Sequence, residues 1–208
     1  MSRAMIVVAA GSSSRFDGDK MLTMVGGVAL VAMTVVRVSP LVDQCVLVCR
    51  ADQIDQLKGL ALAAVIVPGG PTRTDSEVAG LSALTGDPEL IGIHDGARPN
   101  VSPALIERLF EQAALVGGAV PVVPPSGVLI DRDTHAPMSD LMAAQTPQVF
   151  RGPDLVECYR TASVAGFVGH DTHEVVSRYG SLEVAAVPGE GTNIKVTYPS
   201  DLAGIIPR

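Results

Sequence analysis

Two basic residues follow a short apolar segment near the start of the chain. Residues 5–8 read Met-Ile-Val-Val, and the small-residue run at 9–14 leads to Arg15 and then Lys20. A turn of small residues after a buried strand leaves backbone N–H groups free to bind an anion, and we expect a helix to begin after it. The two cations add the positive charge that a triphosphate needs. The alternative is an ordinary strand-to-helix turn with solvated charges.

A glycine-rich turn is predicted at residues 68–76, which read Pro-Gly-Gly-Pro-Thr-Arg-Thr-Asp-Ser. Glycines let the backbone come close to a flat ligand such as a nucleotide base, and the Ser76 hydroxyl can form a hydrogen bond with it. A routine turn that ends in a helix cap is the alternative interpretation.

A third cluster follows a very apolar stretch, where residues 92–99 read Gly-Ile-His-Asp-Gly-Ala-Arg-Pro. Asp95, at the end of the predicted strand, is well placed to hold Mg²⁺ that bridges phosphates, since this ion prefers carboxylate and phosphate oxygens. Arg98 is positioned to contact a second anion. We interpret His94 as a residue that packs or orients the turn and not as a metal ligand.

The fourth cluster is Gly-Thr-Asn-Ile-Lys-Val-Thr at residues 191–197, and it carries Lys195. If this segment is a strand, Ile194 and Val196 face the core and Lys195 faces the other way. Lys195 would then complete a ring of cations with Arg15, Lys20 and Arg98. An edge-strand lysine that discourages aggregation is the alternative.

Short apolar runs rich in valine and isoleucine alternate along the chain with segments of helical period. The runs predict strands at 5–9, 45–49, 65–67, 90–94 and 119–123. The segments between them predict helices at 30–38, 52–62, 75–84 and 103–116. Strands this apolar are buried on both faces, which is typical of a parallel sheet covered by helices. Ligands in such folds bind outside the carboxyl ends of the strands, where the first three clusters lie.

The pattern changes after residue 123. Residues 124–141 have the prolines, glycine and short apolar run of a protruding β-arm, which is commonly a subunit contact; a plain surface hairpin is the alternative. Beyond the arm we expect helices near 154–165 and 173–179, a strand at 182–187, and a closing strand and helix from 193. Since no linker or repeat divides the chain, residues 1–208 are predicted to form a single α/β domain.

Composition excludes several classes of protein. The formal net charge of −7 over 208 residues leaves no broad basic surface for nucleic acid. No run approaches the roughly 18 apolar residues that a membrane span requires, and the N-terminal segment does not resemble a signal peptide. Cys45, Cys49 and Cys158 are interpreted as buried reduced thiols. These features predict a soluble cytoplasmic protein that holds an anionic substrate with a local cluster of cations.

Taken in order with Gln-Thr-Pro-Gln at 145–148, the four clusters resemble those of the 2-C-methyl-D-erythritol 4-phosphate cytidylyltransferases. The resemblance spans nearly the whole chain. The first cluster alone indicates only the wider nucleotidyltransferase superfamily. The segments His-Asp-Gly-Ala-Arg-Pro (94–99), Gln-Thr-Pro-Gln and Asn-Ile-Lys-Val-Thr (193–197) are far more specific to this family and to close relatives that act on pentitol phosphates.

The resemblance implies a Rossmann-like fold with a mostly parallel sheet, helices on both faces and a short β-arm through which two chains form a homodimer. It also implies an enzyme of the isoprenoid precursor pathway. In that reaction a phosphate of 2-C-methyl-D-erythritol 4-phosphate attacks the α-phosphate of CTP, and pyrophosphate leaves. Mg²⁺ neutralises the leaving group, and no covalent enzyme intermediate is needed. No general base is required either, because the acceptor phosphate is already ionised at neutral pH.

The resemblance also assigns roles by motif match. The residues expected to surround the cytosine and ribose are Ala9, Ala10, Gly11, Gly70 and Ser76. The residues expected to stabilise the reacting α-phosphate are Arg15, Lys20 and Lys195. Asp95 would help to position Mg²⁺. On the acceptor side the expected contacts are Arg98 and Thr192.

The departures from the family pattern lie on the acceptor side. Gly127 follows Ser126 where an Asp-Thr pair is usual, Met138 stands where the arm usually has an arginine (with Arg132 as a substitute), and Thr192 replaces an acidic residue. Three hypotheses follow: a cytidylyltransferase for methylerythritol phosphate, one for another polyol phosphate such as a pentitol phosphate, or an idle nucleotide-binding paralogue. The retained cations and Asp95 argue against the third.

Overall fold

The computed structural model describes residues 1–16 and 18–206. Among these residues eight strands form one sheet in the order β10-β7-β11-β6-β1-β4-β5, with β12 paired to β7. Strand β11 runs antiparallel to both of its neighbours, and β10 runs antiparallel to β7, while the other pairs are parallel. The strands are β1 (Arg3–Val8), β4 (Gln44–Cys49), β5 (Val65–Pro68), β6 (Leu90–Asp95), β7 (Gly117–Val123), β10 (Ala143–Ala144), β11 (Gln148–Arg151) and β12 (Glu183–Pro188).

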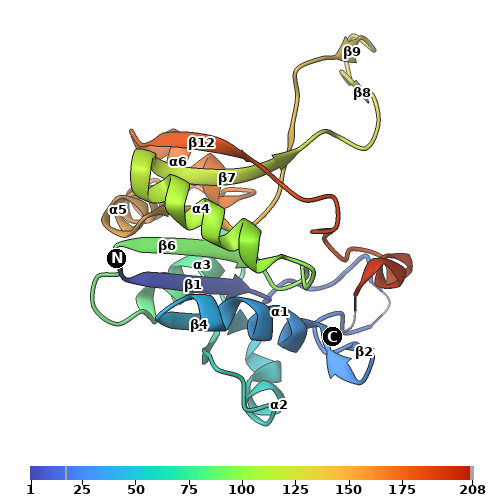
Figure 1. The fold of residues 1–208 in the computed structure, drawn as a ribbon, viewed down its shortest axis with the longest axis vertical. Helices are drawn as coiled ribbons and strands as arrows, with labels where there is room; N and C mark the ends of the chain where they lie inside the picture. Colours follow the sequence, from blue (N-terminus) through green and yellow to red (C-terminus); the bar gives the residue numbers. More distant parts are fainter. Residues whose placement is uncertain (17, 207–208) are drawn as a thin grey trace.

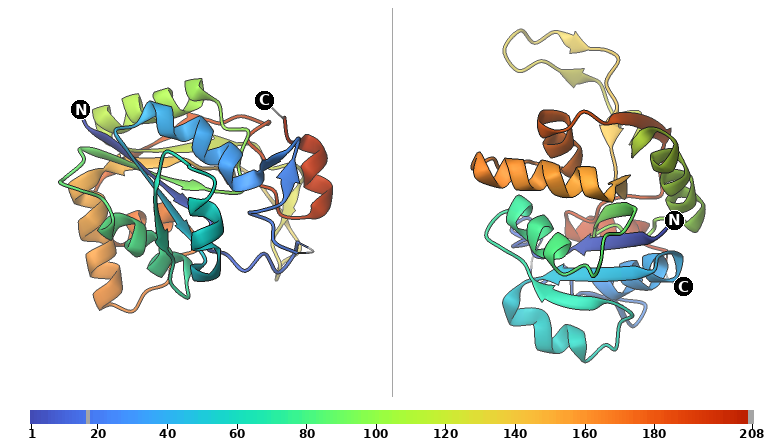
Figure 2. Two further views of the ribbon diagram at one scale, coloured as in Figure 1. Left: turned by 90° about the horizontal axis from the view of Figure 1, so that it is seen from below. Right: turned by 90° about the vertical axis from the view of Figure 1, so that its left-hand side faces the viewer.

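Helices cover both faces of this sheet (Figures 1 and 2). Alternate residues of β1 explain why: Met5 and Val7 pack in one apolar cluster with side chains of α1, α2 and α4, while Ala4 and Ile6 pack in another with those of α3, α5 and α6. The predicted α/β class is therefore confirmed. The helices are α1 (Leu30–Val38), α2 (Ile54–Lys58), α3 (Arg73–Ser82), α4 (Pro103–Val116), α5 (Gly152–Val164) and α6 (Thr172–Tyr179).

Helix α4 begins and ends where the sequence predicts. The Ser102 side chain accepts a hydrogen bond from the Leu105 N–H, Pro103 occupies the first turn, and Gly117 closes the helix with φ of 122°. This left-handed conformation suits glycine, and it lets β7 start directly after the helix. None of the described helices is both long and apolar enough to cross a membrane.

The helix predicted at 30–38 is present as α1, but it does not follow the small-residue turn directly. A small hairpin of β2 (Met24–Val25) and β3 (Val28–Ala29) lies between them. Gly26 and Gly27, with φ of 58° and 84°, form its tight turn. Among the described residues no helix begins at the turn, so the groups expected to bind an anion there are its own backbone N–H groups and the two cations.

Two other predicted elements differ from the structure. The helix predicted at 52–62 is shorter, because a 3₁₀ turn at Ala51–Gln53 leads into α2 and Ala61 adopts a left-handed φ of 50° just after it. The closing strand is absent from residues 193–197, and the last element is a 3₁₀ helix, Pro199–Gly204, and not an α-helix. Proline at its first position and few apolar anchors favour this short form.

The predicted arm is present. The chain leaves the main sheet after Val123 and rejoins it at Ala143, and between them β8 (Leu129–Ile130) pairs with β9 (Pro137–Met138) as a separate two-stranded sheet. Figure 1 shows this hairpin projecting away from the rest of the molecule.

Candidate active site

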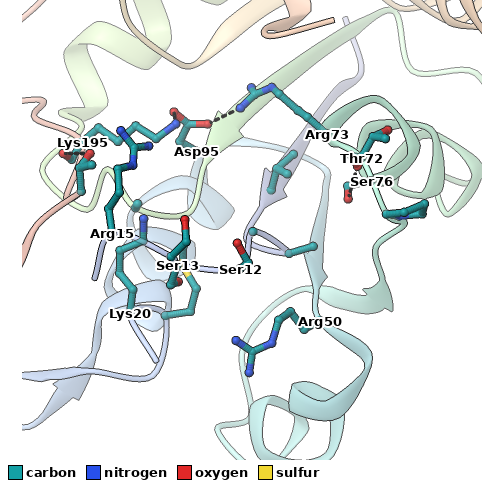
Figure 3. A pocket seen from close by; sticks show the side chains of 18 of the residues that line it. Ser12, Ser13, Arg15, Lys20, Arg50, Thr72, Arg73, Ser76, Asp95 and Lys195 are labelled. Atoms are coloured by element: carbon teal, nitrogen blue, oxygen red, sulfur yellow. Dashed lines mark hydrogen bonds and ion pairs between the residues drawn. The ribbon is translucent and has the colours of Figure 1, made fainter. Parts of the chain in front are cut away.

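A cavity of about 580 Å³ opens at the carboxyl ends of β1, β4, β5 and β6. Three of the four clusters identified in the sequence line it together with Lys195 from the fourth (Figure 3). Its described charged residues are Arg15, Lys20, Arg50, Arg73, Asp95 and Lys195. A single carboxylate among five cations favours a strongly anionic ligand.

Asp95 is the centre of the charge arrangement. It is 5% exposed, and its oxygens lie 2.9 Å from Arg73 Nη1, 2.9 Å from Lys195 Nζ and 3.4 Å from Arg98 Nε. Burial by itself raises the pKa of the Asp95 carboxyl, but Arg73, Lys195 and Arg98 hold this pKa well below its usual range. Asp95 is therefore an anion that offsets part of the surrounding positive charge.

Lys20 and Lys195 lie close together although they are far apart in the sequence. The Lys20 ammonium donates a hydrogen bond to the Val196 carbonyl, with a nitrogen–oxygen distance of 3.1 Å. Burial lowers the pKa of Lys20, and repulsion from Lys195 lowers it further. The opening turn and the segment after residue 192 therefore form one cationic wall, on which Figure 3 also shows Arg15.

At the opposite wall of the cavity, the chain segments around Ala10, Gly69 and Ser76 pack closely together. A Cβ atom added to Gly69 would lie 2.5 Å from the Ala10 Cβ and 2.7 Å from the Ser76 Oγ. The Gly69 N–H donates to the Cys49 carbonyl at the end of β4. Only glycine allows this approach, so the wall exposes backbone and small side chains such as Ala10 and Gly70 to the cavity.

Lys195 is held by a network and not by a strand. The Asn193 side chain donates to the Thr146 carbonyl, the Gln145 side chain donates to the Glu190 carbonyl, and the Val196 N–H donates to the Ala97 carbonyl. Val196 is fully buried while the Lys195 side chain is 38% exposed, so the predicted alternation of faces is present without the predicted strand. The segment 145–148 thus positions the lysine segment.

His94 is a structural residue, as the sequence predicts. Its ring is fully buried, with one nitrogen 2.9 Å from the Thr146 hydroxyl oxygen and the other 3.2 Å from the Arg98 carbonyl. Burial lowers the pKa of His94 to about 4, so the ring is neutral at physiological pH.

A family model for 2-C-methyl-D-erythritol 4-phosphate cytidylyltransferase matches residues 3–205. The chain belongs to this family. A cytidylyltransferase of this name from Dehalococcoides mccartyi is 35% identical, over 95% of this chain and 91% of its own length. The crystal structure of the Thermus thermophilus enzyme superposes with a TM-score of 0.82 at 30% identity, covering 98% of this chain and 96% of that one.

Some relatives of this chain are longer. A bifunctional enzyme IspD/IspF from Granulibacter bethesdensis is 38% identical over 99% of this chain, which spans 56% of that protein. The chain therefore spans about half the length of its bifunctional relatives and nearly the full length of the single-function ones.

The structure brings most of the predicted site residues into one cavity. Those that line it are Ala10, Gly11, Arg15, Lys20, Gly70, Ser76, Asp95 and Lys195. Ala9, Arg98 and Thr192 do not line the cavity. Ala9 is buried beneath the turn, and the Arg98 guanidinium donates to the Asn193 carbonyl at 2.7 Å, behind Asp95. Thr192 is exposed outside the cavity.

Sequence reasoning missed two cations of the cavity, Arg50 and Arg73. Arg50 directly follows β4 and pairs with Asp19 and Asp52. The rule that ligands bind at the carboxyl ends of parallel strands would have found it, because it follows a clear apolar run. Arg73 stands in the glycine-rich segment, and only its pairing with Asp95 makes its place in the cavity evident.

We expect Gly69→Ala to weaken nucleotide binding. The new methyl group would force the Ala10 segment away, since the Ala10 Cβ is fixed to its backbone, and would turn the Ser76 hydroxyl out of its place. Overpacking of this kind costs about 1–3 kcal/mol of stability, and because the displaced segments line the cavity we expect roughly tenfold weaker CTP binding by calorimetry. Gly191→Ala is the control for stability, because a Cβ there meets nothing within 4 Å. Unchanged CTP binding in Gly69→Ala would show that this wall does not contact the nucleotide.

Proposed function

We propose that this chain transfers CMP from CTP to 2-C-methyl-D-erythritol 4-phosphate and releases pyrophosphate. The observation that carries the proposal is the make-up of the cavity. A wall of backbone and small side chains faces Arg15, Lys20 and Lys195, and Asp95 is the one described carboxylate of the cavity. The family membership supports the same reaction, since the relatives are named for it.

The proposed reaction is a displacement at phosphorus. An oxygen of the acceptor phosphate bonds to the α-phosphorus of CTP while the bond from that phosphorus to the bridging β-phosphate oxygen breaks. Arg15, Lys20 and Lys195 stabilise the negative charge that develops on the α-phosphate oxygens. The acceptor phosphate is already ionised at neutral pH, so the reaction needs no general base.

Asp95 is the residue that would help to hold Mg²⁺. Within the described part of the chain no group of three His, Cys, Asp or Glu side chains could hold a metal by itself. A lone carboxylate fits Mg²⁺, because this ion takes most of its ligands from substrate phosphates and water in sites of this kind. When bound, Mg²⁺ would neutralise charge on the leaving pyrophosphate.

Pyrophosphate release tests the proposal. The protein is incubated with CTP, Mg²⁺ and one acceptor at a time: 2-C-methyl-D-erythritol 4-phosphate, a pentitol phosphate, or none. We expect release with the first acceptor and preference for CTP over ATP and GTP. Release only with the pentitol phosphate would favour the alternative acceptor, in line with the changes at Gly127, Met138 and Thr192. No release with either acceptor, together with tight CTP binding, would indicate a non-catalytic nucleotide-binding protein.

We also propose that two chains form a homodimer through the arm. Apolar side chains are exposed along it, with Val128 at 75% and Ile130 at 60% exposure. A group of exposed apolar side chains of this kind is typical of a protein–protein interaction site. The arm residues concerned are Val128, Leu129, Ile130, Met138, Leu141 and Met142.

We expect light scattering after gel filtration to give twice the chain mass of 21.5 kDa for the wild type. Ile130→Asp places a charge in the proposed interface and should give the single-chain mass. Val164→Asp is the matched control, because Val164 is 82% exposed at the end of α5 and should leave the dimer intact. A wild-type protein of single-chain mass would contradict the proposal.

A further inference from the structure

A fully buried carboxylate lies behind the cavity wall, and the proposed reaction does not use it. Glu77 is 0% exposed and stands on α3, one turn after Arg73. Glutamate is almost never fully buried unless its charge is paired, because removing a carboxylate from water is costly. The groups that pair with the Glu77 carboxylate therefore show how it is stabilised beside the cavity.

Glu77 has one ion-pair partner and two hydrogen-bond donors, which come from three helices. Arg73 Nε of α3 lies 2.9 Å from one carboxylate oxygen, and the Thr172 hydroxyl of α6 donates to the same oxygen at 3.0 Å. The Tyr159 hydroxyl of α5 donates to the other oxygen at 2.6 Å. Tyr159 and Thr172 are themselves buried, with 2% and 0% exposure. Burial raises the pKa of the Glu77 carboxyl, and Arg73 and the two hydroxyl groups oppose that shift.

Arg73 connects this buried group to the cavity. One edge of its guanidinium faces Glu77, and Nη1 on another edge donates to Asp95 at 2.9 Å (Figure 3). The second oxygen of Asp95 contacts the Lys195 ammonium at 2.9 Å. A continuous series of charged groups therefore runs from Glu77 on α3 through Arg73 and Asp95 to Lys195 in the cavity.

The position of the Arg73 guanidinium depends on Glu77. The guanidinium lies between two carboxylates, held by a hydrogen bond to Asp95 and by an ion pair with Glu77. Without Glu77 the guanidinium would be held by Asp95 alone, and Asp95 also serves Arg98 and Lys195. A shift of Arg73 would then change how Asp95 holds Lys195.

We propose that Glu77, Tyr159 and Thr172, here called the backing cluster, position Arg73 against Asp95 and thereby set the place of Lys195 in the cavity. The backing cluster touches no substrate and acts through Arg73. This inference rests on the proposed function, because Lys195 is assigned there to the reacting phosphate. It adds positioning residues on α5 and α6 that no motif of the sequence indicates.

A double-mutant cycle tests the inference. Glu77→Gln keeps the shape of the side chain and removes its charge, and we expect kcat/KM to fall about tenfold, as for other residues that orient a charged ligand group. In an Arg73→Met background the same change should alter kcat/KM less than about twofold, because the group through which it acts is gone. An equal loss in both backgrounds would overturn the proposal.

Variants that remove the Thr172 or Tyr159 hydroxyl group test the same inference if Glu77→Gln or Arg73→Met does not fold. Thr172→Val removes one donor at constant shape and should lower kcat/KM about threefold, whereas Thr172→Ser keeps the hydroxyl and should restore most of it. Tyr159→Phe should resemble Thr172→Val. Equal kcat/KM in the valine and serine variants would overturn the proposal, because a purely packing role depends on the methyl group that valine retains.

The design separates this inference from the proposed function. If the wild type releases pyrophosphate and Glu77→Gln does so at the same rate, the backing cluster is excluded while the function stands. If the wild type releases none, the same variants are compared by calorimetry with CTP. Displaced cations should weaken CTP binding about tenfold in Glu77→Gln and little in Thr172→Ser. Equal dissociation constants throughout would overturn the role of the cluster in that case.

Discussion

Lys20→Ala should lower turnover by about 100-fold or more while leaving the fold intact. The Lys20 ammonium lies in the cationic wall, fixed by its hydrogen bond to the Val196 carbonyl. It is assigned to the α-phosphate, where negative charge is greatest in the transition state, so its loss should reduce kcat more than CTP binding. Steady-state kinetics with CTP as the varied substrate measures both quantities.

Lys58→Ala is the matched control for this change. The chain has only three lysines, and Lys58 is the one outside the cavity, exposed at the end of α2. We expect the control to retain wild-type kinetics. A Lys20→Ala protein with turnover within a few-fold of the wild type would remove Lys20 from the catalytic residues.

Asp95→Asn should have the largest effect on stability. Asparagine keeps the shape of the side chain but leaves Arg73, Arg98 and Lys195 without their shared counter-charge. Breaking a buried ion pair costs about 3–5 kcal/mol, and we expect a loss near the lower limit because the Lys195 side chain is partly exposed. Urea denaturation at pH 7 measures it. Since the pKa of Asp95 lies well below its usual range, this contribution is complete at pH 7 and is lost only in strong acid.

A ligand experiment makes the Asp95 prediction specific. Pyrophosphate brings negative charge to the cavity, so it should stabilise Asp95→Asn more than it stabilises the wild type. Asp87→Asn is the control, because Asp87 is exposed and does not line the cavity. Equal stability of Asp95→Asn and Asp87→Asn would show that the cation cluster does not depend on Asp95.

The regular elements follow from local patterns in the sequence. Buried β1, β4 and β6 are continuous apolar runs, and α4 carries Ser102, Pro103 and Gly117 at its boundaries. In each case the signal lies within a few residues of the element that it predicts. The carboxyl-end rule then places Gly11, Gly70 and Asp95 on one rim before any contact is known.

The failures arise where distant contacts decide the structure. Residues 193–197 have the alternation of a strand, but side chains from outside the segment bond to their backbone in place of a neighbouring strand. Lys20 donates to the Val196 carbonyl, and the Thr197 N–H donates to the Asp201 carboxylate. The Arg98 guanidinium donates to the Asn193 carbonyl, a contact that no local pattern in the sequence indicates. Glu77 stands on α3, and only the packing of α5 and α6 against that helix shows what it contacts.

Direct detection of the product tests the central claim most directly. Phosphorus NMR follows a mixture of the protein, CTP, Mg²⁺ and 2-C-methyl-D-erythritol 4-phosphate. The proposed function predicts equal amounts of pyrophosphate and a new diphosphate that joins cytidine to methylerythritol, formed only when all components are present. Unchanged CTP and acceptor in the presence of folded protein that binds CTP would contradict it.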